Sequence, residues 1–312
     1  MGEKKSLRET YGKTLVNLGK IHNDIVVLDA DLAKSTKTEL FKKEFPERFF
    51  DMGISEADMI GTATGLASAG FKCFCSSFAM FLTGRVYDQI RNSIAYPHWN
   101  VKLVSTHAGI SVGEDGASHQ CIEDIALMNV IPGMTVLCPS DSVMTEALTR
   151  ELYEYESYAY MRLPRNDLEL LYDEKDSFGI GKSFVHKIGA DITIIACGAM
   201  VSVAKNTLLR FQSMGIDAGL VDMYSIKPLD SKTLEEVLSK TKGLLVAEEH
   251  SVIGGLGSSV AHFASEKKPI KMSFVGIEDV FGESGTPDSL FEKYNLTEEA
   301  ILKKGKILYD SF

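Results

Sequence analysis

Short runs of apolar residues alternate along the chain with segments whose apolar residues recur every three or four positions. The runs predict strands at 24–31, 71–77, 101–107, 134–140 and 158–164. The helical spacing predicts helices at 57–70, 84–96 and 141–155. Strands that alternate with helices in this way form a parallel sheet with helices on both faces. The first half of the chain is therefore predicted to be an α/β domain.

A polar stretch at 165–183 interrupts this pattern, and a second α/β series begins with the apolar run ADITIIACG at 190–198. We therefore expect two domains, 1–170 and 187–312, joined by a linker at 171–186. With 312 residues, of which 45% are apolar, the chain can form a core in each domain.

The charge and the cysteines narrow the function classes. The formal charge of −10 is spread along the chain without a basic block, which argues against nucleic acid and anionic membranes as partners. No apolar run approaches the roughly 20 residues of a membrane span, and the charged start MGEKKSLRET is unlike a signal peptide. We expect a cytoplasmic protein. The five cysteines form no CxxC pair, so neither a disulfide framework nor a zinc site is predicted.

Three predicted loops lie at the ends of predicted strands. THAGISVGEDGASHQ (106–120) holds two histidines, two adjacent acids and three glycines, and DADLAKS (29–35) and SSFAMFL (76–82) follow two other strands. Ligands of parallel sheets bind beyond the carboxyl ends of the strands, so these loops are predicted to share one site. Two alternatives stay open for 106–120: a metal site, although no HExxH-like spacing occurs, or a solvated loop without function.

The stretch GISEADM (53–59) predicts a helix start. Ser55 followed by Asp58 is a capping-box pattern, which places Glu56 in the first turn. An acid there can simply favour the positive end of the helix dipole. The helix that follows is rich in glycine and alanine, however, so it can pack closely and bury its first turn. A buried Glu56 then needs a partner.

These strings together carry a resemblance. GISEADM, SSFAMF, THAGISVGEDGASHQ and IPGMTVLCPSD are similar to the pyrimidine-binding domain of transketolase, and the second half resembles the C-terminal domain of that family. Only the C-terminal half of a full-length transketolase is covered. The GDG motif of the front half, which holds magnesium and diphosphate, does not occur here. The resemblance thus implies a split enzyme whose other half is a separate chain.

The resemblance implies thiamine diphosphate as the cofactor, with its Mg²⁺ ligands on the partner subunit and no metal ligand here. Glu56 corresponds to the glutamate that contacts the N1′ nitrogen of the aminopyrimidine ring. Phe78 and Phe81 match aromatic residues that pack on this ring, and Asp31 matches an aspartate near the cofactor. Gly84 stands where a third aromatic is expected, and Tyr87 is the candidate to replace it. Two phenylalanines at this spacing are otherwise common in a core.

The resemblance also implies substrate contacts. His107 and His119 match histidines that contact substrate oxygens and move protons, which makes them catalytic together with Glu56. Asp115 matches a residue that binds a sugar hydroxyl. Arg165 and Ser35 match phosphate-binding positions, and Lys5 lies where a further cation is expected. Arg85 and Arg91 receive no role.

The implied partners are an N-terminal transketolase subunit and sugar phosphates, with self-association through both domains into a heterotetramer. The glycine cluster EEHSVIGGLGSS (248–259) lacks a complete dinucleotide or P-loop fingerprint and is attributed to packing.

The predicted function is transfer of a two-carbon ketol unit between sugar phosphates, and four alternatives remain. One is a split transketolase for an unusual, branched or sulfonated sugar. A deoxyxylulose-phosphate-synthase-like enzyme normally has DRAG where THAG stands here, and a 2-oxoacid dehydrogenase β subunit lacks the GEDGxxHQ string. The last is a non-catalytic regulatory paralogue, against which Glu56, His107, Asp115 and His119 together argue.

Overall fold

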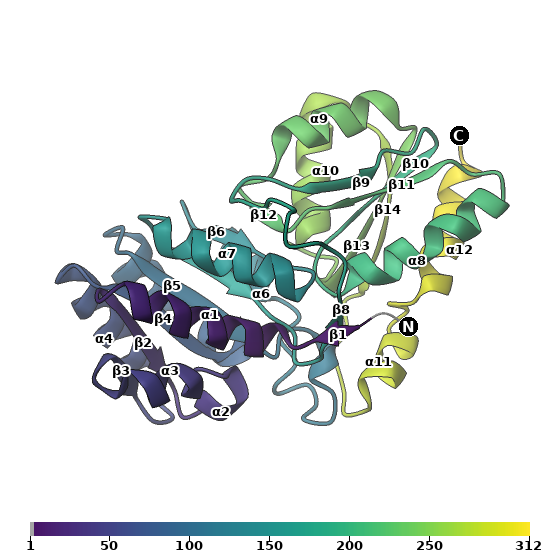
Figure 1. Ribbon diagram of the computed structural model, residues 1–312. Coiled ribbons are helices and arrows are strands. Elements are labelled where there is room, and N and C mark those ends of the chain that lie inside the picture. The colour runs from purple at the N-terminus through teal and green to yellow at the C-terminus, as the bar shows by residue number, and fades with distance from the viewer. Residues whose placement is uncertain (1–2) are drawn as a thin grey trace.

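Two α/β units, each built around its own sheet, make up the computed structural model, which describes residues 3–312 (Figure 1). The first sheet has seven strands in the order β12-β6-β7-β5-β4-β2-β3. Their bounds are Ile25–Asp29 (β2), Phe49–Asp51 (β3), Lys72–Phe78 (β4), Val101–Thr106 (β5), Thr135–Leu137 (β6), Ala159–Arg162 (β7) and Ser225–Lys227 (β12). Strands β2 to β7 pair in parallel, which confirms the predicted α/β architecture.

Helices cover both faces of this sheet. On one face, α1 (Leu7–Ile21) packs beside α7 (Ser142–Glu154), and Leu15 and Leu148 are fully buried in the same apolar cluster. On the other face lies α4 (Glu56–Ser68), which buries Met59, Ile60 and Ala63. The shorter helices of this unit are α2 (Ala33–Thr36), α3 (Glu39–Glu44), α5 (Tyr87–Gln89), α6 (Asp124–Asn129) and the 3₁₀ turns η1 (Pro46–Arg48) and η4 (Ile110–Val112).

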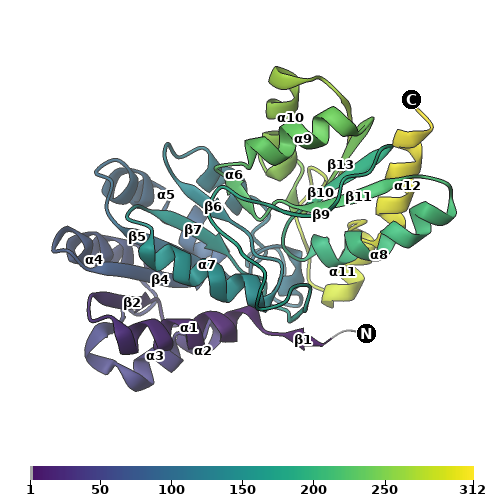
Figure 2. The same cartoon turned by 45° about the horizontal axis from the view of Figure 1, so that its top comes forward.

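The second unit repeats the layered plan. Its sheet has the order β14-β13-β10-β11-β9, with all neighbours parallel except β11 and β9. Helices α9 and α10 lie on one side of this sheet, and α8 and α12 lie on the other (Figure 2). The bounds are Phe184–Lys187 (β9), Ile192–Ala196 (β10), Met200–Ser213 (α8), Ala218–Asp222 (β11), Ser231–Lys240 (α9), Gly243–Ser251 (β13), Leu256–Lys267 (α10), Lys271–Ile277 (β14), Pro287–Lys293 (α11) and Glu298–Tyr309 (α12).

Two strand pairings tie distant parts of the chain together. Strand β12, which follows β11 of the second unit, pairs antiparallel with β6 at the edge of the first sheet. Strand β1 (Lys4–Lys5) pairs antiparallel with β8 (Leu168–Glu169), so the start of the chain lies against the segment that follows β7.

Two local predictions were wrong, and a third missed an irregularity. The stretch 76–82, expected as a loop, is the end of β4 and the start of a π-helix, η2 (Met80–Gly84). The helix predicted at 84–96 is present over 87–95, but it consists of α5 followed by a second π-helix, η3 (Ile90–Ala95). The capping box is absent because Ser55 forms a tight turn, in which its N–H donates to the carbonyl oxygen of Gly53 at 2.7 Å, and its side chain caps nothing.

Within residues 3–312, we find no helix with both the length and the apolar character needed to cross a bilayer.

Candidate active site

The carboxyl ends of β4 and β5 bring two predicted site residues together. The parallel register pairs Phe78, the last residue of β4, with Thr106, the last residue of β5. His107 follows directly, and its ring stacks on Phe78 with 3.8 Å between ring centroids. Because parallel strands end at one edge of the sheet, the pairing of β4 with β5 creates this contact.

Phe81 and His119 extend this aromatic group. Phe81 lies nearly parallel to Phe78, with 6.0 Å between centroids. The His119 ring meets the edge of Phe81 at 5.3 Å and that of Phe78 at 6.4 Å. His119 is half-buried, whereas His107 is buried at 4% exposure. The two histidines predicted to contact substrate thus lie against the two phenylalanines predicted to pack on a cofactor ring.

His107 is held in an unusual conformation and kept neutral. Its φ of 58° is in the left-handed region, which non-glycine residues rarely adopt. Its Nδ1 hydrogen-bonds the Thr106 hydroxyl at 2.8 Å. Burial lowers the pKa of His107 to about 3, and the nearby charges of Arg8, Arg165 and His119 add to this effect. At neutral pH the imidazole is therefore uncharged.

Glu56 has a charged partner that the sequence did not reveal. It lies in the first turn of α4 and is 2% exposed, as its predicted burial requires. Arg85, which follows η2, donates from Nη1 to Glu56 Oε2 at 2.9 Å. The central carbon of the Arg85 guanidinium group lies 4.3 Å from the centroid of the Phe81 ring. One cation thus joins the buried glutamate to the aromatic group.

Arg8 connects two of the predicted phosphate-binding positions. Its Nη1 donates to the Ser35 carbonyl at 2.8 Å, and its Nη2 donates to the Arg165 carbonyl at 2.7 Å. Burial lowers its pKa, and its Nε has no hydrogen-bond partner among the described residues. Lys5, the cation expected here, lies on β1, pairs with Glu3 at 3.5 Å and is half exposed.

Sequence reasoning missed Arg8 because it missed α1. A signal was present, since Ser6 followed by Glu9 is a capping-box pattern ahead of apolar residues at helical spacing. In the structure the Ser6 hydroxyl accepts from the Glu9 N–H at 3.3 Å. That cap starts α1 and places Arg8 in its first turn.

Arg165 contacts the 106–120 loop beside Asp115. Arg165 Nη1 donates to the Val112 carbonyl at 2.5 Å and to Glu114 Oε2 at 3.1 Å. Asp115, the next residue, is exposed. Arg165 therefore shapes the loop that carries Asp115 and His119.

The loop after β2 is organised by a buried acid. Asp29 accepts from the Thr36 and Thr38 hydroxyls at 2.7 and 2.8 Å and from the Leu32 N–H at 2.7 Å. Burial raises the pKa of Asp29 to about 6. This anchoring holds Asp31, with φ at 60°, and Ser35 at the same sheet edge as Phe78.

Gly84 and Tyr87 follow the phenylalanines of the aromatic group along the chain. Tyr87 is half-buried and packs against the apolar core on the α4 side of the sheet. At Gly84, an added Cβ would meet only the Met80 sulfur, at 3.8 Å.

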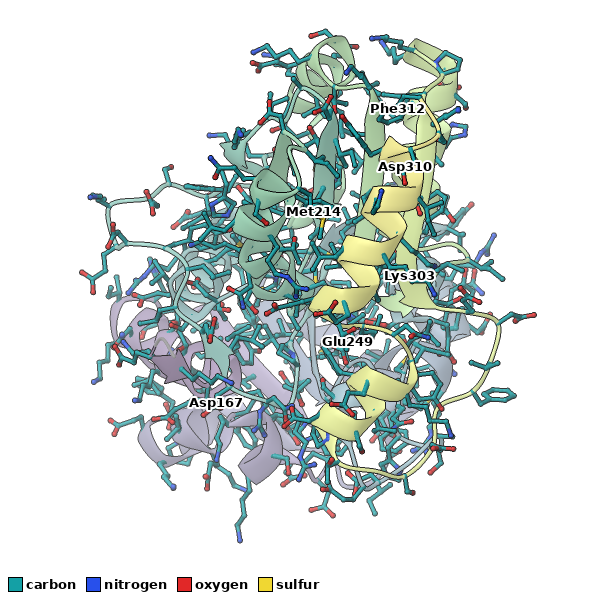
Figure 3. All side chains as sticks on the ribbon, turned by 90° about the vertical axis from the view of Figure 1, so that its right-hand side faces the viewer. Asp167, Met214, Glu249, Lys303, Asp310 and Phe312 are labelled. Carbon is teal, nitrogen blue, oxygen red and sulfur yellow. The ribbon has the colours of Figure 1, made fainter. Side chains whose placement is uncertain are left out.

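The second unit holds the 106–120 loop through hydrogen bonds. Buried Glu249, labelled in Figure 3 near the junction of the units, accepts from the Ser111 N–H at 2.8 Å. Gln120 donates from Nε2 to the carbonyls of Gly113 at 3.1 Å and Glu283 at 2.8 Å. The site loop is therefore held by both units.

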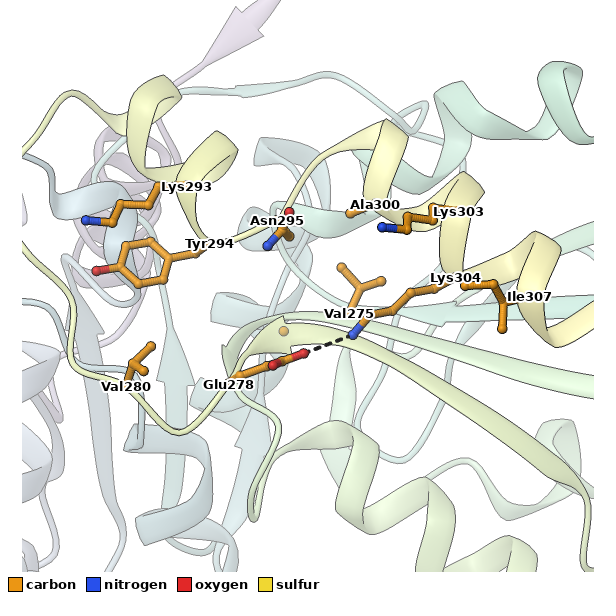
Figure 4. A pocket seen from close by; sticks show the side chains of 11 residues that line it. Val275, Glu278, Val280, Lys293, Tyr294, Asn295, Ala300, Lys303, Lys304 and Ile307 are labelled. Carbon is orange, nitrogen blue, oxygen red and sulfur yellow. Dashed lines mark hydrogen bonds and ion pairs between the residues drawn. The ribbon is translucent and has the colours of Figure 1, made fainter.

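Neither the glycine cluster nor a cavity between β14 and α12 in the second unit joins this site. Glu248 accepts from the N–H groups of Leu256 and Gly257 at 2.7 and 2.8 Å, so a carboxylate occupies the α10 N-terminus where a phosphate would bind. A cavity of about 480 Å³ lies between β14 and α12, and Figure 4 shows the side chains that line it. Two of its three lysines already pair with acids, Lys293 with Glu283 and Lys304 with Glu278 at 3.3 Å.

Comparisons with known proteins identify the family. A model of the transketolase pyrimidine-binding domain matches residues 3–169, and a model of the transketolase C-terminal domain matches residues 181–301. This chain belongs to the transketolase family. A Methanocaldococcus jannaschii protein named for a transketolase C-terminal section is 48% identical over 307 residues, which cover 97% of this chain and 96% of that protein.

Two further transketolase relatives match over nearly their whole length. The 6-deoxy-6-sulfo-D-fructose transketolase subunit SqwH of a Clostridium species is 38% identical, with 96% of this chain and 94% of that protein covered. A solved structure titled as a split gene transketolase, inactive β4 tetramer, is 47% identical, with a TM-score of 0.91 and 98% of both chains covered. The chain therefore corresponds to the C-terminal section of a split transketolase.

Proposed function

We propose that this chain is the C-terminal subunit of a thiamine-diphosphate-dependent transketolase that moves a two-carbon ketol unit from a ketose phosphate to an aldose phosphate. The observation that carries the proposal is the buried Glu56 carboxylate, which Arg85 links to the aromatic group in which His107 stacks on Phe78 and His119 meets the edge of Phe81. Aromatic side chains near one buried carboxylate suit an aminopyrimidine ring, which has aromatic faces and a ring nitrogen that can share a proton.

When bound, thiamine diphosphate supplies the nucleophilic carbon and the electron sink for breaking a carbon–carbon bond next to a carbonyl. Glu56 would share a proton with the ring nitrogen N1′. Phe78 and Phe81 would orient the ring through apolar contact. Asp31, on the loop anchored by Asp29, would border the cofactor.

The substrate is held by the groups around the 106–120 loop. His107, neutral at physiological pH, can donate a hydrogen bond to a substrate oxygen without placing a charge there. His119 can hold or move a proton at a neighbouring oxygen, and the exposed Asp115 can accept from a sugar hydroxyl. Arg165, Arg8 and Ser35 form the region that binds the anionic end of the sugar.

The diphosphate and Mg²⁺ are assigned to a separate N-terminal subunit. The chain has no GDG motif, the string that the resemblance associates with magnesium and diphosphate. The related solved structure is titled as an inactive tetramer of β chains, which supports two expectations for this chain: it self-associates, and it needs the other subunit for activity.

The test is coexpression with a reading frame that carries GDG, followed by assay with thiamine diphosphate, Mg²⁺, xylulose 5-phosphate and ribose 5-phosphate. We expect no transfer by either chain alone and transfer by the complex. Glu56→Gln should lower the rate at least about 100-fold without unfolding the chain, because it removes the carboxylate proposed to contact the ring nitrogen. Glu44→Gln, at an exposed position, is the matched control. Wild-type rates in Glu56→Gln would refute the assigned role.

A second substrate class is favoured by one relative. The 38% identical protein is named for a sulfonated ketose, and two arginines can bind a sulfonate as well as a phosphate. The same complex should therefore be assayed with 6-deoxy-6-sulfofructose. A higher kcat/KM for that donor than for xylulose 5-phosphate would assign the enzyme to sulfosugars.

A further inference from the structure

Arg85 contacts Glu56, and the proposed function gives this contact no role. It reaches from the end of η2 to the first turn of α4 and binds Glu56 at 2.9 Å. The Glu56 side chain is 2% exposed, whereas that of Arg85 is 49% exposed. A half-exposed cation thus approaches a buried carboxylate from the solvent side. A charged hydrogen bond of this kind restricts the carboxylate to one orientation.

The backbone before Arg85 is irregular, and the Arg85 side chain lies over an aromatic ring. Met80–Gly84 forms a π-helix, a rare geometry that is frequent at functional sites. Gly84 contributes no side chain, and the space at its Cβ is open apart from the Met80 sulfur. The Arg85 guanidinium instead lies over Phe81, at 4.3 Å from the ring centroid. This is the range of a cation–π contact.

The two oxygens of Glu56 have different surroundings. Oε2 accepts the hydrogen bond of Arg85. Oε1 receives no hydrogen bond from residues 3–312. One oxygen is therefore fixed by the protein, and the other is left for a ligand.

We propose that Arg85 is a positioning residue that orients Glu56 through Oε2, so that Oε1 is ready for the ring nitrogen of the cofactor. Its planar guanidinium over Phe81 also stands in for the aromatic residue that Gly84 lacks. This inference rests on the proposed function, because it needs an aminopyrimidine ring at Glu56. The contrasting possibility is that Arg85 competes with the ring for Glu56 and must leave before the cofactor binds.

The experiment measures binding of thiamine diphosphate with Mg²⁺ to the two-subunit complex by titration calorimetry, alongside kcat at saturating cofactor. Arg85→Gln should raise the Kd for thiamine diphosphate about 10-fold or more, the usual effect of losing a hydrogen bond to a charged group. Arg85→Lys retains the charge without the planar fork and should recover part of the loss. It also keeps the test decisive if the glutamine variant unfolds.

A double-mutant cycle separates positioning from a general structural role. In the Glu56→Gln background, Arg85→Gln should change the Kd less than about twofold, because Arg85 acts through Glu56. Arg91→Gln, which removes another arginine from the same helical segment, is the control and should bind like wild type. Its Nη1 contacts only the Asn92 side chain among the described residues.

Three results would overturn the inference while leaving the proposed function in place: an unchanged Kd in Arg85→Gln, tighter binding in that variant, or an equal loss in the Glu56→Gln background. Tighter binding would mean that Arg85 competes with the ring. A wild-type complex that binds no thiamine diphosphate would overturn the proposed function and this inference together.

Discussion

At the scale of single residues, the site loop depends on backbone conformations that most side chains avoid. His107, Gly109, Gly113 and Gly116 all have positive φ, between 58° and 86°. At Gly109 the constraint is also steric, because an added Cβ would lie 2.2 Å from Glu249 Oε1. Glu249 is buried and accepts the Ser111 N–H, so it cannot move away without losing that bond. Glycine at 109 thus permits the contact between loop and second unit.

We predict that Gly109→Ala lowers the free energy of unfolding by about 2–4 kcal/mol, because it combines a strained φ with overlap of a buried carboxylate. Urea unfolding of the isolated chain measures this loss. Gly179→Ala is the matched control, since its new Cβ would meet neighbours only at 3.7 Å and beyond. Equal stability of the two variants would contradict the steric role of Glu249.

His107 makes the stability of the chain depend on pH. Its folded pKa of about 3 lies below the unfolded value of about 6.5, so acid protonates the unfolded chain first. Its contribution is therefore lost as the pH falls from about 6.5 toward 3. Between pH 7 and pH 5 this amounts to about 2 kcal/mol. Urea unfolding at both pH values should show that the free energy of unfolding falls less between pH 7 and pH 5 in His107→Gln than in wild type. The surface variant His262→Gln should behave like wild type.

At the scale of elements, the 106–120 loop is closed by the segment that joins β14 to α11. Gln120 is 2% exposed, and its amide donates to a carbonyl of its own loop and to Glu283 of that segment. At Gly116, a Cβ would lie 2.6 Å from the Ser284 hydroxyl, so the two backbones run close together. Because Asp115 and His119 lie between these contacts, their positions depend on the joining segment.

We predict that Gln120→Ala costs about 1–2 kcal/mol, because it removes the hydrogen bond to the Glu283 carbonyl that ties the loop to the joining segment. Amide hydrogen exchange should become faster at 110–119 and remain unchanged in β10. Gln212→Ala, at an exposed position, should stay within about 0.5 kcal/mol of wild type. Unchanged exchange in the loop would show that Gln120 does not hold it closed.

At the scale of the whole molecule, the two units share a buried charge network. Arg162, at the end of β7, donates to Asp124 Oδ2 at 2.8 Å and to the Glu249 carbonyl of the second unit at 2.9 Å. Tyr160 also donates to Asp124, at 2.6 Å. Together with the pairing of β12 and β6, this network joins the units through hydrogen bonds inside the protein. We therefore expect the units to unfold together.

We predict that Arg162→Met destabilises the chain by about 3–5 kcal/mol, because Asp124 would stay buried without its cation. The double variant Arg162→Met with Asp124→Leu should cost less than the sum of the single variants. Urea unfolding can be followed by fluorescence of Trp99, the single tryptophan, and by circular dichroism, with Arg91→Met as the control. A loss below about 1 kcal/mol in Arg162→Met would contradict the role of the network.

The accuracy of sequence-based prediction differed between elements for physical reasons. The apolar runs at 101–107 and 190–198 are strands because a strand buried on both faces needs continuous apolar residues. Strand β12 has three residues and no pattern of its own, so its pairing with β6 could not be predicted. The π-helices after β4 were missed because the 3.6-residue spacing cannot register an extra residue in a turn.

The sequence by itself determined the alternation of strands and helices, and with it the two parallel sheets and the loops at their carboxyl ends. It also contained the strings that resemble transketolase. Only the tertiary structure decided which cation meets which acid: Arg85 lies on Glu56, and Arg8 links Ser35 to Arg165. The alternation of strands and helices follows from the pattern of apolar and polar residues within each segment. Contacts between residues 27 to 157 positions apart depend on strand register and helix packing, which no single segment encodes.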